Sequence, residues 1–116
     1  MSDPIILASR SEIRATLLRN AGVDFTVDVA RVDEDAIKQA LRAEDAPPRD
    51  IADTLAEMKA KRIASKHSDA LVIGCDQVLA FQQQTLSKPT SPDDALVQLK
   101  MMRGKVHQLL SAAVIY

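Results

Sequence analysis

The alternation of apolar and polar residues along the chain predicts a regular succession of short strands and helices. Apolar runs and apolar–polar alternation predict strands over residues 4–8, 23–29, 71–81, 85–87 and 105–116. Apolar residues at helical spacing predict helices over residues 11–22, 50–67 and 91–104, and a shorter helix that ends at residue 41. The order β-α-β-α-α-β-β-α-β predicts a single α/β domain over residues 1–116, bordering on α+β, with a central mixed, twisted sheet flanked by helices.

The apolar run at residues 71–81 carries the first candidate for chemistry. It is interrupted in the middle by Gly-Cys-Asp-Gln, residues 74–77. A carboxylate inside a buried strand is costly unless it has a partner or a task. Asp76 therefore lies either at the floor of a cleft that the sheet holds rigid, or at the end of a strand where it begins a turn. Gly74 allows a second backbone or a ligand to come close at this point.

Polar residues gather where the first predicted strand passes into the first predicted helix. They are Ser9, Arg10, Ser11 and Arg14, with Ser11 as the expected N-cap. Free backbone N–H groups at a helix start attract anions, and an arginine fork donates two parallel hydrogen bonds to a phosphate. The junction is thus a candidate phosphate site. The alternative is an ordinary capped helix with solvated arginines, because the glycine-rich pattern of a P-loop is missing.

Two further charged features are open to a structural and a functional interpretation. The acids at residues 33–35 precede the short helix. Carboxylates can hold Mg²⁺ or Mn²⁺ together with phosphate, but acids at a helix start also interact favourably with the helix dipole. Lys59 follows Leu55 by four residues and lies near the apolar edge of the helix over residues 50–67. Its side chain extends to solvent or reaches into a cleft.

Composition narrows the function classes. The chain has 116 residues, a formal net charge of −1 and 27% charged residues, which is typical of one globular domain and argues against a sequence-independent nucleic-acid binder. No apolar run approaches the roughly 20 residues that a membrane span needs, and the N-terminus lacks a signal-peptide pattern. A single cysteine, Cys75, favours a reducing, cytoplasmic setting and is interpreted as inert packing.

Six short motifs follow one another along the chain. They are residues 7–18 (LASRSEIRATLL), Val32-Asp33-Glu34, Lys59-Ala60, Gly74-Cys75-Asp76-Gln77, Lys88-Pro89 and Gly104-Lys105-Val106-His107. In type, order and spacing they resemble the Maf family of nucleoside triphosphate pyrophosphatases, which is also associated with inhibition of septum formation. Members of that family are longer, and this chain stops within an apolar strand, so we expect an N-terminal portion.

The resemblance implies a reaction and a set of roles. A nucleoside triphosphate would be hydrolysed to the monophosphate and pyrophosphate with a divalent cation, Mg²⁺ or Mn²⁺. Asp76 would be the general base or would hold the metal, and Glu34 would help to position the metal. The phosphates would be bound by Ser9, Arg10, Ser11, Arg14, Lys59 and Lys88. The resemblance alone suggests a homodimer.

Departures from the family pattern bear on substrate choice. Glu12 stands where the family usually has Pro, Ser87 where it has Gly, and Ser111 where Thr is common. Gln77, which could read a base edge through its amide, resembles the subgroup that acts on 7-methyl-GTP rather than on dTTP and UTP, although that subgroup often has Trp at the position of Ile13. The alternative function is a non-catalytic nucleotide- or partner-binding regulator of cell division.

Overall fold

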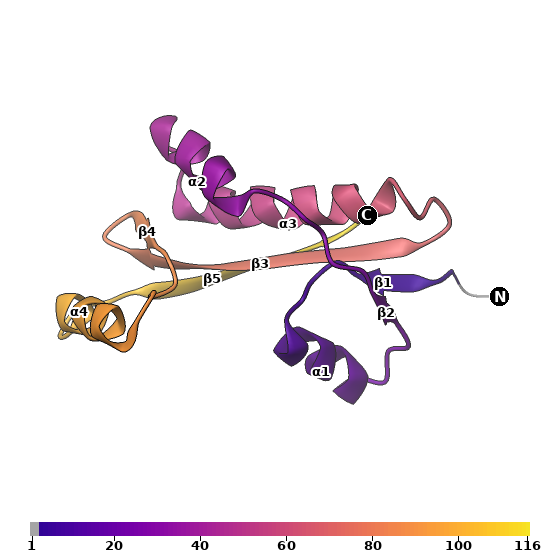
Figure 1. Cartoon of the computed structure of the whole chain (residues 1–116), viewed down its shortest axis with the longest axis horizontal. Helices are drawn as coiled ribbons and strands as arrows, with labels where there is room; N and C mark the ends of the chain where they lie inside the picture. Colours follow the sequence, from indigo (N-terminus) through magenta and orange to yellow (C-terminus); the bar gives the residue numbers. More distant parts are fainter. Residues whose placement is uncertain (1–2) are drawn as a thin grey trace.

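The elements of the chain follow the predicted order (Figure 1). The structure is a computed structural model that describes residues 3–116. Its strands are β1 (Ile5–Leu7), β2 (Thr26–Val27), β3 (Leu71–Phe81), β4 (Gln84–Leu86) and β5 (Gln108–Ile115). Its helices are α1 (Glu12–Asn20), α2 (Glu34–Ala43), α3 (Pro48–Ala64) and α4 (Pro92–Met102). The predicted α/β class with one mixed sheet is therefore confirmed.

Strand β3 is the centre of the five-stranded sheet. Strand β5 pairs antiparallel with residues 73–80 of β3 along one edge. The other edge is shared, because β1 pairs in parallel with residues 71–73 and β4 pairs antiparallel with residues 79–81. The middle of β3, residues 74–78, thus lies between the two partners on that edge. A sheet interrupted in this way leaves room for side chains and ligands beside its central strand.

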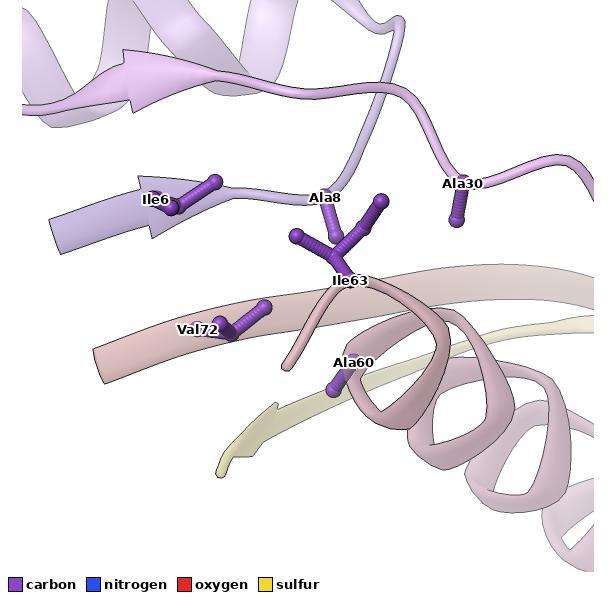
Figure 2. Close-up of a cluster of buried hydrophobic side chains, with 6 residues drawn as sticks. All are labelled: Ile6, Ala8, Ala30, Ala60, Ile63 and Val72. Carbon is purple, nitrogen blue, oxygen red and sulfur yellow. The ribbon is translucent and has the colours of Figure 1, made fainter. Parts of the chain in front are cut away.

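The two faces of β3 are covered by different helices. Successive side chains of a strand point to opposite faces. Val72 and Val78 belong to the apolar clusters formed with α3, whereas Ile73 and Cys75 pack with residues of β1 and α1. Figure 2 shows the first of these clusters, in which Ile63 of α3 lies among residues of β1, β3 and the segment after β2. Among the helices, α3 supplies the largest number of buried apolar residues.

Gly74 allows α3 to lie unusually close to the sheet. A Cβ at this position would come within 2.2 Å of the backbone oxygen of Ala56 and 2.8 Å of the Cβ of Ala60. Real Cβ atoms do not approach backbone this closely, so a larger residue would force the helix away. The predicted close approach of a second backbone at Gly74 is confirmed. Helix α3 is the backbone concerned.

Four local predictions need correction. The last strand, predicted over residues 105–116, begins only at Gln108, because a turn at Arg103 and Gly104 follows α4. Strand β3 runs without a break through Asp76, so the turn interpretation of that residue is wrong; pairing with β5 keeps its backbone in the ladder. The strand predicted over residues 23–29 forms only over Thr26–Val27, because this edge strand has just two partner residues in β1. Helix α3 begins at Pro48 rather than at residue 50, since proline is well tolerated in the first turn of a helix.

The face of the sheet opposite α3 is partly open. Leu109 and Ile115 of β5 are exposed there, and α4 buries none of its residues although Leu96 and Leu99 are apolar. One contact that anchors α4 is polar: Gln98 Nε2 donates to the Ser87 carbonyl at 2.8 Å. Within residues 3–116, no helix combines the length and the apolar character needed to cross a bilayer.

Candidate active site

A cleft of about 1360 Å³ opens beside the middle of β3. Its walls come from the segment after β1, the start of α1, the start of α2, the middle of β3 and the segment after β4. The fold positions the cleft, because residues 74–78 of β3 separate the strand's pairing with β1 from its pairing with β4. Every site residue predicted from the sequence lines this cleft: Ser9, Arg10, Ser11, Ile13, Arg14, Glu34, Lys59, Asp76, Gln77 and Lys88.

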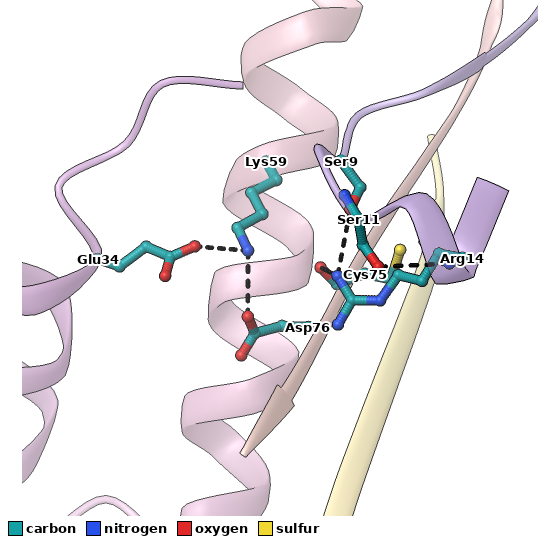
Figure 3. Close-up of polar contacts among 7 residues, drawn as sticks. All are labelled: Ser9, Ser11, Arg14, Glu34, Lys59, Cys75 and Asp76. Carbon is teal, nitrogen blue, oxygen red and sulfur yellow. Dashed lines mark hydrogen bonds and ion pairs between the residues drawn. The ribbon is translucent and has the colours of Figure 1, made fainter. Parts of the chain in front are cut away.

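Lys59 joins two carboxylates from distant parts of the chain (Figure 3). Its Nζ lies 2.6 Å from Glu34 Oε1 and 3.1 Å from Asp76 Oδ1. Only 12% of the lysine side chain is exposed, so it reaches into the cleft and does not extend to solvent. The trio connects the first residue of α2, the middle of α3 and the middle of β3. Sequence reasoning named all three residues but did not predict that they contact one another.

Among residues 3–116, one carboxylate oxygen of Asp76 has no partner. Its side chain is 10% exposed, and Oδ2 is buried without a hydrogen bond, while Oδ1 accepts from Lys59. A buried polar atom without a partner costs on the order of 1–3 kcal/mol. A buried carboxylate oxygen without a partner in a cleft indicates an atom that is available to a ligand, a water molecule or a proton.

The carboxyl group of Glu34 is held in its charged form. Partial burial raises its pKa, but the hydrogen bond from Lys59 and the positive charges of Lys59, Lys38 and Lys88 outweigh that effect. The pKa of Glu34 is therefore lowered from its ordinary value. The cleft thus holds a cluster of lysines whose field favours negative charge. Lys38 was not anticipated from the sequence, where nothing distinguishes it from other helix-surface lysines.

The segment after β1 is fixed by the two serines and Arg14. Ser11 caps α1, its Oγ accepting from the Arg14 backbone N–H at 3.3 Å, and its own N–H donates to Ser9 Oγ at 3.2 Å. The Arg14 guanidinium donates from Nη1 to Ser9 Oγ at 3.2 Å and to the Cys75 carbonyl at 3.4 Å. Arg14 therefore points back at the turn and ties it to β3 (Figure 3).

The remaining predicted residues lie farther along the walls. Arg10 is exposed, Lys88 follows β4, and Ile13 is 76% exposed on α1. Gln77 lies on the face opposite α3, where its Nε2 donates to Ser111 Oγ at 2.8 Å. Sequence reasoning noted Ser111 only as a departure from a family pattern. The cross-strand pairing of Gln77 with Ser111 was not visible in the sequence, because it depends on the register of β3 and β5.

The interpretation of the acids at residues 33–35 as a helix start is confirmed. Asp33 is the N-cap of α2 and accepts from the Ala36 backbone N–H at 3.1 Å, so the three acids mark a helix start. In the part of the chain that the structure describes, no group of three or more His, Cys, Asp or Glu residues could together hold a metal ion. Cys75 is buried against Leu7 and Ala15, which agrees with a packing role.

The fold and the cleft by themselves indicate a class of protein. It is an α/β protein whose central strand carries an unpartnered carboxylate oxygen beside lysines, an arginine and a capped helix start. Such surroundings suit a multiply charged anion such as a phosphate ester or anhydride. Comparison with known proteins makes this class specific. The family model described as Maf-like protein matches residues 4–116, and the chain belongs to that family.

Curated relatives match over nearly the whole chain. A protein of Ruegeria pomeroyi, named nucleoside triphosphate pyrophosphatase, is 66% identical over 116 residues, which is 100% of this chain and 58% of the relative. A Caulobacter vibrioides protein of the same name is 48% identical over 97% of this chain and 56% of its own length. A Brucella abortus protein named 7-methyl-GTP pyrophosphatase is 42% identical over 99% of this chain and 58% of its own length. The chain thus spans less than two thirds of each relative.

Proposed function

We propose that this chain carries the catalytic centre of a nucleoside triphosphate pyrophosphatase. The observation that supports this most directly is the trio in which Lys59 joins Glu34 to Asp76 while Asp76 Oδ2 stays buried without a partner. The lysine cation can bind a phosphate, and the neighbouring carboxylate oxygen can accept a proton in the same place. The names of the relatives from Ruegeria and Caulobacter agree with this proposal.

In the proposed reaction, water attacks the α-phosphorus of a nucleoside triphosphate. A bond forms between the water oxygen and phosphorus, the bond from phosphorus to the bridging oxygen breaks, and pyrophosphate leaves with that electron pair. Asp76 Oδ2 accepts the proton of the water. Lys59 and Lys88 stabilise the charge that develops on the pyrophosphate. The serine–arginine turn, with Ser9, Ser11 and Arg14 as its fixed members and Arg10 at its rim, binds the phosphates.

We propose a divalent cation, Mg²⁺ or Mn²⁺, as the cofactor. Mg²⁺ is commonly bound by one or two carboxylates together with substrate phosphates. Glu34 and Asp76 would supply these carboxylates, because both line the cleft and Asp76 retains a buried oxygen without a partner. Holding the ion and accepting the proton are alternative roles for this oxygen of Asp76. When bound there, such an ion would lower the pKa of a coordinated water molecule and offset phosphate charge.

The test is pyrophosphate release by the complete natural protein with Mg²⁺, with Mn²⁺ and with a chelator. The substrates are 7-methyl-GTP, dTTP, UTP and ITP, and the Ruegeria pomeroyi relative serves as the assay control. We expect release that depends on the metal. Binding of nucleotide without any release, under conditions where the control is active, would contradict the proposal and favour a binding-only regulator.

Among these substrates we propose 7-methyl-GTP as the preferred one. Two observations support it: Gln77 follows Asp76, and the Brucella abortus relative carries that substrate in its name. We expect the highest kcat/KM for 7-methyl-GTP. A higher kcat/KM for dTTP or UTP would contradict this choice without affecting the proposed reaction.

A further inference from the structure

We propose that Ser111 is a positioning residue for Gln77, and that the pair selects bases whose ring edge carries an N–H donor. This inference rests on the proposed function. Gln77 of β3 and Ser111 of β5 are direct cross-strand partners, and both line the cleft on the face opposite α3. The amide Nε2 of Gln77 donates to Ser111 Oγ at 2.8 Å. Side chains that are directly opposite on neighbouring strands lie close enough to interact in a fixed geometry.

The hydrogen bond determines what the Gln77 amide can offer a ligand. A free glutamine amide turns about its last torsion and can present either its carbonyl oxygen or its NH₂ group. In this chain, Ser111 binds the nitrogen and so holds the plane of the amide. The amide nitrogen keeps one further N–H, and we assign base recognition to the carbonyl oxygen Oε1, which can only accept hydrogen bonds.

The position of Ser111 is itself supported. Its backbone carbonyl accepts a hydrogen bond from Arg49 Nη1 at 3.1 Å, and Arg49 also pairs with Asp53 at 3.3 Å on α3. These contacts join the edge strand β5 to the helix that lies on the other face of the sheet. The Ser111 hydroxyl that faces Gln77 therefore lies on backbone that pairs with β3 on one side and binds Arg49 on the other.

An acceptor held in this way predicts a substrate class. Hypoxanthine, guanine, uracil and thymine carry a ring N–H on the edge used for base pairing, whereas adenine and cytosine carry an acceptor nitrogen there. An acceptor facing a ring nitrogen without a proton leaves a polar group unsatisfied, which costs affinity. We therefore expect ITP to be preferred to ATP, and UTP to CTP, within pairs of equal size.

The experiment measures kcat/KM for ITP, ATP, UTP and CTP with the complete natural protein and its variants. In the unaltered protein, ITP should exceed ATP and UTP should exceed CTP, each at least tenfold. Ser111→Ala should reduce both ratios by about tenfold, which corresponds to about 1.4 kcal/mol, chiefly through KM, because contact with the base is equal in the ground and transition states. Ser111→Thr keeps the hydroxyl and should keep the ratios.

Two comparisons separate positioning from a merely structural effect. A damaged fold lowers kcat/KM for all four substrates alike and leaves the ratios unchanged. In a Gln77→Ala background, Ser111→Ala should change the ratios no further, because Ser111 acts through Gln77. Gln108→Ala alters an exposed residue on the same strand that does not line the cleft, and should leave the ratios intact.

The outcomes distinguish failure of this inference from failure of the proposed function. Hydrolysis with ratios that Ser111→Ala does not change, or without a preference for ITP and UTP, overturns the inference and leaves the function standing. Binding of non-hydrolysable ITP and ATP analogues, measured by calorimetry, provides a readout besides activity. A preference for the ITP analogue that depends on Ser111, with no hydrolysis of any substrate, supports the inference and overturns the function.

Discussion

The two faces of the β3–β5 pair are built from neighbouring residues but have opposite properties. Toward α3, β3 presents Val72, Gly74 and Val78 to a helix that packs against them closely. Toward α1, the same strand presents Gln77, and β5 adds the exposed Leu109. The closed face therefore fixes where the backbone lies, and the open face leaves side chains accessible from the cleft and from solvent.

Asp76 shows what this difference means for chemistry. It belongs to the closed face, where Lys59 of α3 holds one of its oxygens, yet it lies at the gap between β1 and β4. The rigid helix contact gives the carboxylate a defined position, and the gap gives it access to the cleft. Gln77, one residue later, faces the open side. The proposed reaction and the proposed base recognition would thus use adjacent residues of one strand.

The largest expected effect is that of removing the negative charge of Asp76, which lies where the closed face meets the cleft. Asp76→Asn should lower kcat by about 10²–10⁴-fold, the usual contribution of a general base. The measurement is steady-state pyrophosphate release, with circular dichroism to show that the fold is retained. Asp24→Asn, at an exposed position outside the cleft, is the matched control. Activity of Asp76→Asn within tenfold of the unaltered protein would exclude the role of base.

Truncating one leucine on each face should show how much each face contributes to the free energy of unfolding. Leu55 of α3 is fully buried, and Leu55→Ala should lower the free energy of unfolding by about 2–5 kcal/mol. Leu109 is 59% exposed, and Leu109→Ala should change it by less than about 0.5 kcal/mol. Urea unfolding of the 116-residue chain measures both. An equal loss at the two positions would mean that the open face is covered in solution.

A finer comparison uses two adjacent alanines of β5. Ala112 is 3% exposed and packs toward α3, whereas Ala113 is exposed on the opposite face. Ala112→Val should destabilise the chain by about 1–3 kcal/mol through overpacking. Ala113→Val should be close to neutral, since valine also suits a strand. If chemical denaturation gave the reverse order, the assignment of the two faces would be wrong.

The smallest expected effect concerns Glu34, whose pKa is lowered in the folded chain. A lowered pKa means that the carboxylate stabilises the fold at pH values above its unfolded-state pKa, and that this contribution is lost as the pH falls through the folded-state pKa. The Glu34 side chain is 40% exposed, so solvent screening limits the effect to at most about 1 kcal/mol. The free energies of unfolding of the unaltered chain and of Glu34→Gln should differ at pH 7 and become equal in acid. A difference that grew in acid would contradict the sign.

Much of this architecture could be predicted from local patterns, because each element carries its own signal. The Ser11 cap, the apolar run over residues 71–81 and the glycine at position 74 each predict a feature that the structure contains. The Maf resemblance, based on short motifs, is confirmed by the family match. The site could be anticipated as a set of residues, but their functional roles remain predictions.

What could not be predicted depends on contacts between distant segments. The length of β2 is limited by its partner β1, and the continuity of β3 through Asp76 depends on β5. The ion pair of Lys59 with Glu34 joins residues from two helices whose relative placement no local pattern encodes. The same holds for Ser111, which becomes a candidate only when the strand register places it opposite Gln77.

The unpartnered oxygen of Asp76 has a thermodynamic consequence for the resting protein. A ligand that satisfies this atom binds the folded chain and not the unfolded one, so occupancy and folding are linked. At a ligand concentration a hundred times the Kd, this linkage raises stability by about 2.7 kcal/mol. The melting temperature of the chain therefore reports whether the site is occupied. In a cell, the protein would be least resistant to unfolding and proteolysis when its ligand is scarce.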